Sequence, residues 1–351
     1  METLYYCGID LHTKQSHLCI IDQEGNRVDE LRMKNDLSGI LKFLSPYSQG
    51  LKIAVESTIN WYWLVDGLKE NGYDVTLAHS AGLSLITGAK VKTDRRDAFK
   101  LARLLRLGEM TQAYVYPVKQ RPVRDLARRR DDLVAERAGL YVRLRALFMQ
   151  YNVNTMGLKA LKAMVADDIN ELALPDEAKL CASLFLERLP LISEQIVRIE
   201  TYLSTKDTAA VCLLMTVPGI GPVFARSIAL EVGDINRFAT EKHFCSYARL
   251  FPGTSESAGK ARRGRRAKEG NPYLKCAFMN AAKIASVYVP EIKALKEKHA
   301  KRRGGKALRG NAVIAHRIGV AAYHMLKTGA VFDLEQFLRG KSSKATAMPV
   351  A

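Results

Sequence analysis

Four acidic residues in the first hundred positions have the types and spacing of metal ligands. Asp10 and Glu56 each follow a short apolar run that is typical of a buried strand. Asp94 and Asp97 are three residues apart, so they share one face of any helix that begins there. Carboxylates suit Mg²⁺, and two such ions about 3.5–4 Å apart can stabilise the attacking and leaving oxygens of a phosphoryl transfer. The four residues therefore predict a two-metal magnesium site.

Two other interpretations of these acids stay open at the level of residues. Asp94 and Asp97 flank Arg95 and Arg96, and the four side chains could form a solvated, salt-bridged helix start. The stretch GIDLHT resembles the first phosphate loop of actin-like ATPases and sugar kinases, but His12 stands where that loop needs glycine. A second Asp-Gly-Gly loop is also missing from the sequence, so a kinase is the minority interpretation.

A second candidate site is the stretch GTSESAGKARRGRRAKEGNP, residues 253–272. Ser255 and Ser257 stand among small residues, and a serine hydroxyl becomes a nucleophile only when a metal or a base activates it. A loop serine that merely hydrogen-bonds is the alternative. The basic residues that follow are expected to neutralise nucleic-acid phosphates rather than read bases; they are Lys260, Arg262, Arg263, Arg265, Arg266 and Lys268.

A glycine pair upstream predicts a further phosphate contact. Gly219 and Gly221, in VPGIGP, form a tight turn between two expected helices. This arrangement resembles a helix-hairpin-helix, whose backbone amides can hold a DNA phosphate. The alternative is that the two glycines only allow a tight turn and contact no phosphate.

The charge of the chain indicates a polyanionic partner. The 351 residues include 54 Lys and Arg against 36 Asp and Glu, a net charge of +18. Neutralising phosphates releases condensed counterions, so nucleic acid is the expected partner and an anionic membrane surface the second choice. Apolar runs are too short to span a bilayer, and no secretory signal is expected. The six scattered cysteines, without a CxxC pair, favour buried, reduced thiols in a cytosolic protein.

The elements that must position the acids alternate between strands and helices. LYYCGID, SHLCIID and RVDELRM predict a three-stranded meander, and LKIAVEST and YDVTLAH predict two further strands separated by a helix. A helix is expected at 37–44 and another after Thr93. This order predicts a mixed α/β layer at residues 1–115.

The rest of the chain is predicted to be helical. Leucines recur every seven residues from Leu126 to Leu147, and apolar residues from Leu189 to Leu203 alternate three and four apart, the spacing of a coiled-coil seam. Residues 116–207 are therefore expected to form an antiparallel hairpin, an oligomer contact or part of an ordinary bundle. Residues 208–335 form a mainly α-helical domain with the helix-hairpin-helix-like turn, and 336–351 a disordered tail.

These motifs together resemble one family of insertion-sequence transposases. GID, AVEST and KTDRRDAFKLARLL are similar to the DEDD motif of a RuvC-like domain, itself a variant of the RNase H fold. VPGIGPVFARSIALEVGDINRF, SYARLFPG, ESAGK and GNPYLKCAFMNAA are similar, in order, to the second conserved region of this family. The family resembles the Piv-type site-specific DNA invertases, and some members are bridge-RNA-guided recombinases. The resemblance covers about residues 3–110 and 210–290.

The resemblance implies a division of roles among the residues. It makes Asp10, Glu56, Asp94 and Asp97 the metal ligands, and it places the catalytic serine five residues after Pro252, at Ser257. Ala258 intervenes before the glycine that normally follows, which leaves Ser255 as a rival. The resemblance further implies a covalent 5′-phosphoserine intermediate, a guide RNA, and dimers or tetramers with composite sites.

Two other functions remain open. A RuvC-like junction resolvase or nuclease would use metal-activated water and would form no covalent adduct. A non-catalytic nucleic-acid-binding protein would keep its activity after substitution of the acids.

Overall fold

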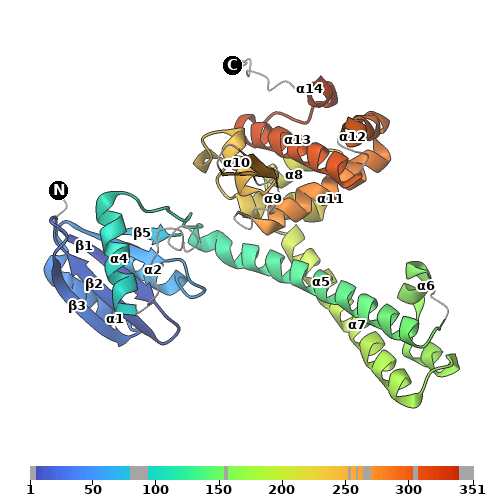
Figure 1. Ribbon diagram of the computed structural model, residues 1–351, viewed down its shortest axis with the longest axis horizontal. Coiled ribbons are helices and arrows are strands. Elements are labelled where there is room, and N and C mark those ends of the chain that lie inside the picture. The colour runs from blue at the N-terminus through green and yellow to red at the C-terminus, as the bar shows by residue number, and fades with distance from the viewer. Residues whose placement is uncertain are drawn as a thin grey trace. The chain divides into compact units, whose positions relative to one another are not determined.

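The structure is a computed structural model in which residues 5–79, 94–153, 157–251, 254–257, 260–263, 270–302 and 307–339 are described. The chain divides into two compact units, residues 1–118 and 119–351. Figure 1 shows the first unit as a sheet with helices and the second as a helical hairpin joined to a helical bundle.

The first unit is built on a five-stranded sheet in the order β3-β2-β1-β4-β5. β1, β2 and β3 form the antiparallel meander, and β4 and β5 continue the sheet in parallel with β1. The predicted strands and the mixed α/β class are confirmed. The strands are β1 Tyr5–Leu11, β2 Gln15–Ile21, β3 Arg27–Lys34, β4 Leu51–Glu56 and β5 Asp74–Ala78.

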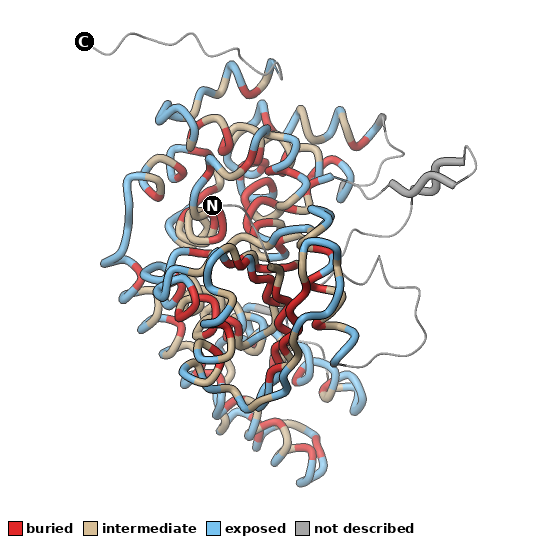
Figure 2. Tube along the Cα trace, turned by 90° about the vertical axis from the view of Figure 1, so that its left-hand side faces the viewer, coloured by how far each residue is buried: buried red, intermediate tan, exposed pale blue. Residues whose placement is uncertain are grey.

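Helices cover both faces of this sheet. On one face α1, Leu37–Leu44, and α2, Tyr62–Glu70, enclose an apolar core with alternate residues of β1 and β4, such as Ile9 and Ile53. Figure 2 shows these buried strands in red. On the other face α4, Asp94–Leu107, packs on the intervening residues. Alternate side chains of the central strands therefore point toward α1 and α2, and the side chains between them point toward α4.

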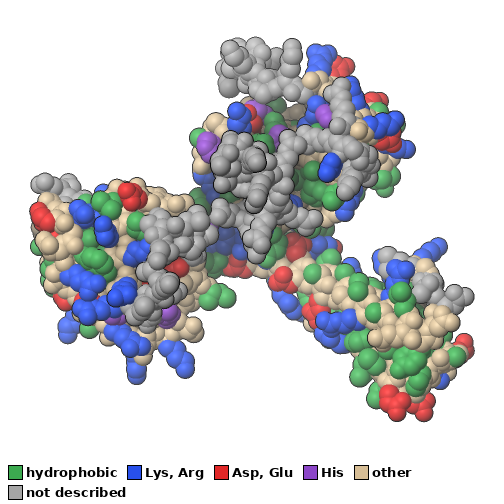
Figure 3. Space-filling view, viewed as in Figure 1, with side chains coloured by type: hydrophobic (Ala, Val, Ile, Leu, Met, Phe, Trp, Pro, Cys, Tyr) green, Lys and Arg blue, Asp and Glu red, His purple; other side chains and the backbone are tan. Residues whose placement is uncertain are grey.

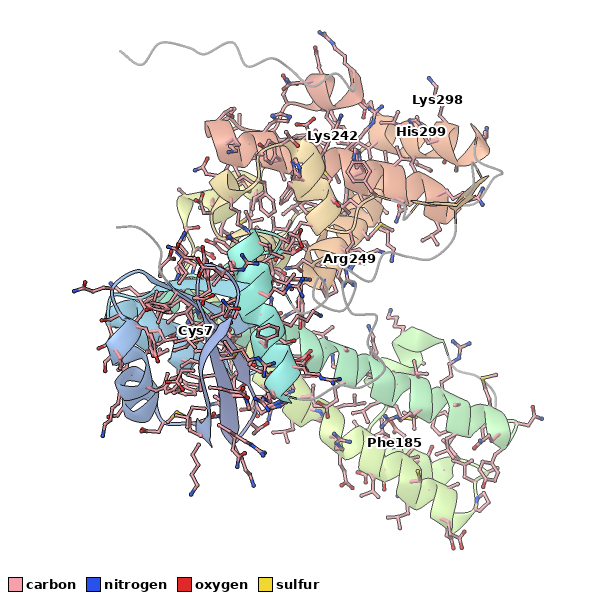
Figure 4. The ribbon with its side chains drawn as sticks, turned by 60° about the vertical axis from the view of Figure 1, so that its left-hand side comes forward. Cys7, Phe185, Lys242, Arg249, Lys298 and His299 are labelled. Atoms are coloured by element: carbon pink, nitrogen blue, oxygen red, sulfur yellow. The ribbon has the colours of Figure 1, made fainter. Side chains whose placement is uncertain are left out.

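Burial also settles the role of the sheet cysteines. Cys7, labelled in Figure 4, is fully buried toward α1 and α2, and burial raises the pKa of its thiol far above the usual value. Burial likewise raises the pKa of Cys19 to about 11. Both thiols are therefore protonated packing groups rather than nucleophiles.

The second unit begins with two long antiparallel helices. α5, Arg121–Gln150, packs along α7, Asp176–Ser204, through Leu140 and Ile192 among others. Of the arrangements expected for this region, the structure shows the antiparallel helical hairpin. A short α6, Leu158–Ala163, lies in the connection.

The described residues of the second unit form seven further helices and a β-hairpin, and the helices enclose a core that includes Phe244 and Phe278. The helices are α8 Ala209–Leu214, α9 Pro222–Val232, α10 Glu241–Tyr247, α11 Pro272–Tyr288, α12 Pro290–Arg302, α13 Ala307–Thr328 and α14 Leu334–Arg339. No helix in the described part of the chain is long and apolar enough to cross a membrane.

Two expectations about this unit are corrected. The serine and basic stretch is not merely a loop, because β6, Thr254–Ser257, pairs with β7, Lys260–Arg263. Residues 336–339, expected in a disordered tail, lie in α14, where Phe337 is buried and Arg317 donates to two backbone carbonyls of the helix. Residues 340–351 lie outside the described part.

Candidate active site

Two of the predicted metal ligands lie at the same edge of the sheet. Gly8 pairs with Ala54 and Ile9 with Val55 across the parallel strands β1 and β4. Continuing this register brings Asp10 and Glu56 side by side at the carboxyl ends of their strands, on the face that α4 covers. Asp10 is 4% exposed, and one carboxylate oxygen is 3.1 Å from Nε2 of His12.

Helix α4 can lie close against β1 because the strand residue that faces it, Gly8, has no side chain. A Cβ on Gly8 would stand 2.0 Å from the carbonyl oxygen of Ala98 and 2.6 Å from the amide nitrogen of Ala102. The far end of α4 reaches the β2–β3 turn, where Arg106 donates to the carbonyl of Gln23 at 3.0 Å. α4 therefore runs antiparallel to β1, and its first turn lies toward the strand end that carries Asp10.

One side of α4 carries the other two acids. Asp97 and Leu101 are four residues apart and so share a side of the helix, and Leu101 packs against Ala54 of β4. Asp94, three residues before Asp97, occupies the same side at the first position of the helix; its side chain lies outside the described residues. The four predicted ligands thus share one end of one layer interface.

Asp97 itself has an unusual environment. Its Oδ2 atom is buried and has no hydrogen-bond partner among the described residues. Leaving a carboxylate oxygen buried and unpaired is costly, and a cation is the ordinary remedy. An unpaired carboxylate oxygen of this kind is a donor that suits a divalent metal ion such as Mg²⁺.

The acids are not gathered into a finished metal centre. Among the residues described, no three His, Cys, Asp or Glu side chains lie close enough together to hold an ion. The fold therefore brings the acids to a common end of the sheet without closing them around a ligand.

The opposite side of α4 carries a network that the sequence did not reveal. Arg95 donates from Nε to Glu30 of β3 at 2.8 Å, and His17 of β2 lies 2.7 Å from the same carboxylate. Burial alone would raise the pKa of Glu30, but the hydrogen bonds from His17 and Arg95 hold it below the usual value. His17 stands directly across from Asp10 in the β1–β2 ladder. Residues 17, 30 and 95 form no sequence motif, so only the fold could identify them.

The candidate nucleophiles occupy the β6–β7 hairpin. Ser257 is opposite Lys260 in the ladder, and Ser255 is opposite Arg262. Ser257 is therefore the residue next to the turn, at the tip of the hairpin, whereas Ser255 is two residues nearer its base. The backbone of Arg263 is also described, but Arg265, Arg266 and Lys268 lie outside the described residues.

The expected glycine turn joins α8 to α9. Gly219 has φ +87°, and a Cβ there would stand 2.3 Å from the carbonyl oxygen of Ala281 in α11. Gly221 precedes α9, and a Cβ there would meet open space. A pocket of about 450 Å³ beside this turn is lined mainly by apolar residues, Ile284 and Tyr288 among them. Packing on α11 thus accounts for Gly219 in structural terms.

Comparison with known proteins identifies the class to which this fold and these acids belong. Residues 7–153 match a transposase domain model named for the DEDD motif and the IS110 family. Residues 211–297 match a second model, described as the transposase of the IS116/IS110/IS902 family. Together the matches cover well over half of the chain, and they define it as a transposase, an enzyme that cuts and rejoins DNA. The chain belongs to the IS110/IS116 family of transposases.

Individual relatives are distant but extend over most of the chain. The transposase for insertion sequence element IS1328 of Yersinia enterocolitica is 22% identical over 343 residues, 95% of this chain and 100% of the relative. The transposase for IS1111A of Coxiella burnetii is 24% identical over 325 residues, 88% of this chain and 87% of the relative. The y4qE transposase of Sinorhizobium fredii is 24% identical over 299 residues, 79% and 70% respectively.

Proposed function

We propose that this transposase cuts and rejoins the DNA of its insertion element through a RuvC-like acid site and a serine nucleophile. The observation that carries the proposal is the common position of Asp10, Glu56 and Asp97 at one end of the sheet under α4, with a buried oxygen of Asp97 left unpaired. The strand order β3-β2-β1-β4-β5 suits an RNase H-type domain.

The acids would act by holding Mg²⁺ at the scissile phosphate. Asp10, Glu56, Asp94 and Asp97 supply carboxylate oxygens, the donors that this hard cation prefers. When bound, the metal neutralises charge that develops on the phosphoryl oxygens. The remaining work of the site is to orient the phosphate, which falls to the rigid strand ends.

Ser257 would perform the exchange of bonds. Its Oγ attacks the phosphorus, the bond from phosphorus to the 3′ oxygen breaks, and a 5′-phosphoserine forms. The serine hydroxyl gives up one proton and the departing 3′ oxygen takes up one, so the step is balanced. One phosphodiester is exchanged for another, and a second 3′ hydroxyl can therefore reverse the step and join new strands without ATP. The position of Ser257 at the tip of the hairpin favours it over Ser255.

Other residues would hold the nucleic acid. We expect the basic residues of the hairpin region to neutralise backbone phosphates; they are Lys260, Arg262, Arg263, Arg265, Arg266 and Lys268. The backbone amides near Gly219 and Gly221 would donate hydrogen bonds to a further phosphate. None of these positions resembles a base-reading helix. This agrees with target choice by a guide RNA of the bridge type, in which base pairing supplies the sequence specificity.

A second apolar face on α7 supports self-association into dimers or tetramers. Leu180, Leu184 and Leu191 lie along one side of this helix and are 63%, 51% and 57% exposed, opposite the residues that pack on α5. Figure 3 shows apolar side chains gathered on the hairpin of α5 and α7. An exposed apolar stripe of this kind is typical of an oligomer contact.

The proposal is tested by trapping the covalent intermediate. The purified protein, with its co-purifying RNA, is incubated with element-end DNA and Mg²⁺, and adducts are resolved on a denaturing gel. We expect an adduct with wild type and with Ser255→Ala. We expect none with Ser257→Ala, although this variant still binds DNA, and none with Asp10→Asn.

Each departure from this pattern contradicts a separate part of the proposal. An adduct that persists in Ser257→Ala and vanishes in Ser255→Ala would move the nucleophile two residues. Cleavage with free ends and no adduct would instead establish a metal-activated water, as in a junction resolvase.

A further inference from the structure

We propose that the contact of Arg95 with Glu30 and His17 is a positioning tether that holds the first turn of α4 in register for metal binding by the acids on the other side of the helix. The inference rests on the proposed acid site. It assigns a function to three residues of the α4–sheet interface that are not themselves metal ligands.

The two sides of α4 have different partners. Asp97 and Leu101 lie on the side toward β1 and β4, as the packing of Leu101 on Ala54 requires. Arg95 and Phe99, four residues apart, lie on the side toward β3. Phe99 has the guanidinium of Arg27 4.4 Å above its ring, and Arg95 bonds to Glu30.

The contact of Arg95 with Glu30 lies at the same end of α4 as the two acids of that helix. Arg95 is the residue after Asp94 and two before Asp97, in the first turns of the helix. Glu30 is fixed from the sheet side because His17, 2.7 Å away, comes from the neighbouring strand. A contact in the first turn restrains the acids of that turn directly, whereas a contact three turns away restrains them only through the intervening helix.

The arrangement differs from an ordinary surface ion pair. An exposed pair contributes little to stability, and Arg95 is 64% exposed. Glu30 is only 20% exposed and is held by His17 as well as Arg95. A positioning contact needs a fixed geometry but need not stabilise the fold. Its loss displaces the metal ligands and so lowers metal affinity, while the free energy of unfolding changes little.

The chain offers a matched control at the other end of the same helix. Arg106 also ties α4 to the β2–β3 hairpin, through the carbonyl of Gln23 at 3.0 Å, but it lies three turns away from the acids. Arg95→Ala and Arg106→Ala remove the same side chain and the same charge. Only the first should disturb the acid end.

The test measures binding of Mn²⁺ alone to the full-length protein by titration calorimetry, with thermal unfolding in metal-free buffer as the fold control. We expect Arg95→Ala and Glu30→Ala each to raise the Mn²⁺ dissociation constant about tenfold, the lower range for groups that orient metal ligands. Arg106→Ala should bind as wild type does. The double variant should be no worse than Glu30→Ala alone, because Glu30→Ala already removes the contact with Arg95.

The signs of the two effects separate positioning from simple charge. Removing Arg95 takes a positive charge from the acids and by Coulomb's law should tighten cation binding, whereas removing Glu30 should weaken it. A tether predicts that both variants weaken it. Tighter binding by Arg95→Ala, or wild-type affinity in both variants, would overturn the inference, as would an equal loss in Arg106→Ala.

One further variant distinguishes failure of the tether from failure of the acid site. Asp10→Asn should abolish Mn²⁺ binding if the proposed site is right. If Asp10→Asn binds Mn²⁺ normally, the acid site itself is wrong. If Asp10→Asn does not bind and Arg95→Ala binds with wild-type affinity, only the tether is wrong.

Discussion

Gly8 is the single residue on which the closeness of α4 to the sheet depends most. A side chain there would collide with the backbone of α4 at Ala98 and Ala102, and backbone atoms cannot move aside as a flexible side chain can. The acids on α4 can reach the end of β1 because this position has no Cβ.

Replacing this glycine should therefore separate the two layers. We expect Gly8→Ala to lower the free energy of unfolding by about 2–3 kcal/mol through overpacking, measured by urea denaturation. Gly139→Ala is the matched control, since a Cβ there meets nothing within 4 Å on α5. That substitution should raise stability by about 0.5–1 kcal/mol through helix propensity. Equal stability of Gly8→Ala and wild type would contradict the packing described.

Single residues differ in how far the sequence could predict their place. Asp10 and Glu56 follow apolar runs, and their position at strand ends was predictable from that pattern alone. The role of Glu30 was not predictable, because it is one polar residue among others on the partly exposed β3. His17 follows two other polar residues at the start of the largely buried β2, and nothing in that pattern marks it. Their partner Arg95 comes from a helix more than sixty residues away, and no local pattern encodes such a contact.

At the scale of elements, α5 is fastened to the C-terminal bundle by a buried carboxylate. Glu231 of α9 is 4% exposed and accepts two hydrogen bonds from Arg128 of α5, at 2.6 and 2.8 Å. Asn271, the residue that caps α11, donates to the same carboxylate at 2.6 Å. Burial alone would lower the pKa of Arg128, but the hydrogen bonds and the charge of Glu231 raise it above its usual value. The carboxylate of Glu231 thus connects three helices, α5, α9 and α11.

The contact of Arg128 with Glu231 should contribute far more to the free energy of unfolding than a surface ion pair does. We expect Arg128→Ala to cost about 3–5 kcal/mol of unfolding free energy, because it leaves Glu231 buried without its counter-charge. Arg226→Ala removes a similar bidentate pair, to the more exposed Asp207, and should cost about 1 kcal/mol. Chemical denaturation of both variants measures the difference. Similar losses would mean that the burial of Glu231 has no energetic consequence.

Regular elements were predictable and the β6–β7 hairpin was not. The strands of the sheet have apolar alternation or apolar runs, and the long helices have apolar repeats that bury Leu133, Leu140 and Ile196 as expected. TSES and KARR have neither, and their composition is that of a polar loop. Pairing between the two segments forms the hairpin, and pairing is not visible in the propensity of either segment alone.

At the scale of the whole molecule, the charge of +18 should govern binding to nucleic acid. Lys and Arg side chains are visible on both units in Figure 3, and Figure 4 marks Lys242, Lys298 and His299 on the second unit. Binding that depends on phosphate neutralisation weakens as salt rises, with a slope of about −0.9 per phosphate contact on a logarithmic scale.

The hairpin should account for a measurable part of this slope. Replacing Lys260, Arg262 and Arg263 together by Ala should reduce the slope of the logarithm of the DNA binding constant against the logarithm of salt concentration by about 2–3. Fluorescence anisotropy over a salt series measures it. A control triple substitution, Lys42, Lys52 and Lys69 to Ala, removes the same charge from the first unit. If the two triple variants changed the slope equally, the hairpin would contribute only through net charge.

The position of α4 has a consequence for the order in which the protein is made. Cys19, Ile21 and Ala54 form the sheet face that α4 covers, yet α4 begins only at Asp94. At about 5–20 residues per second, a ribosome that has completed β5 at Ala78 needs on the order of 1–3 seconds to reach the start of the covering helix at Asp94. During that interval the nascent sheet presents an uncovered apolar face and only part of its acid set. If the acids of α4 belong to the active site as proposed, a chain still on the ribosome cannot have a complete site before α4 has emerged.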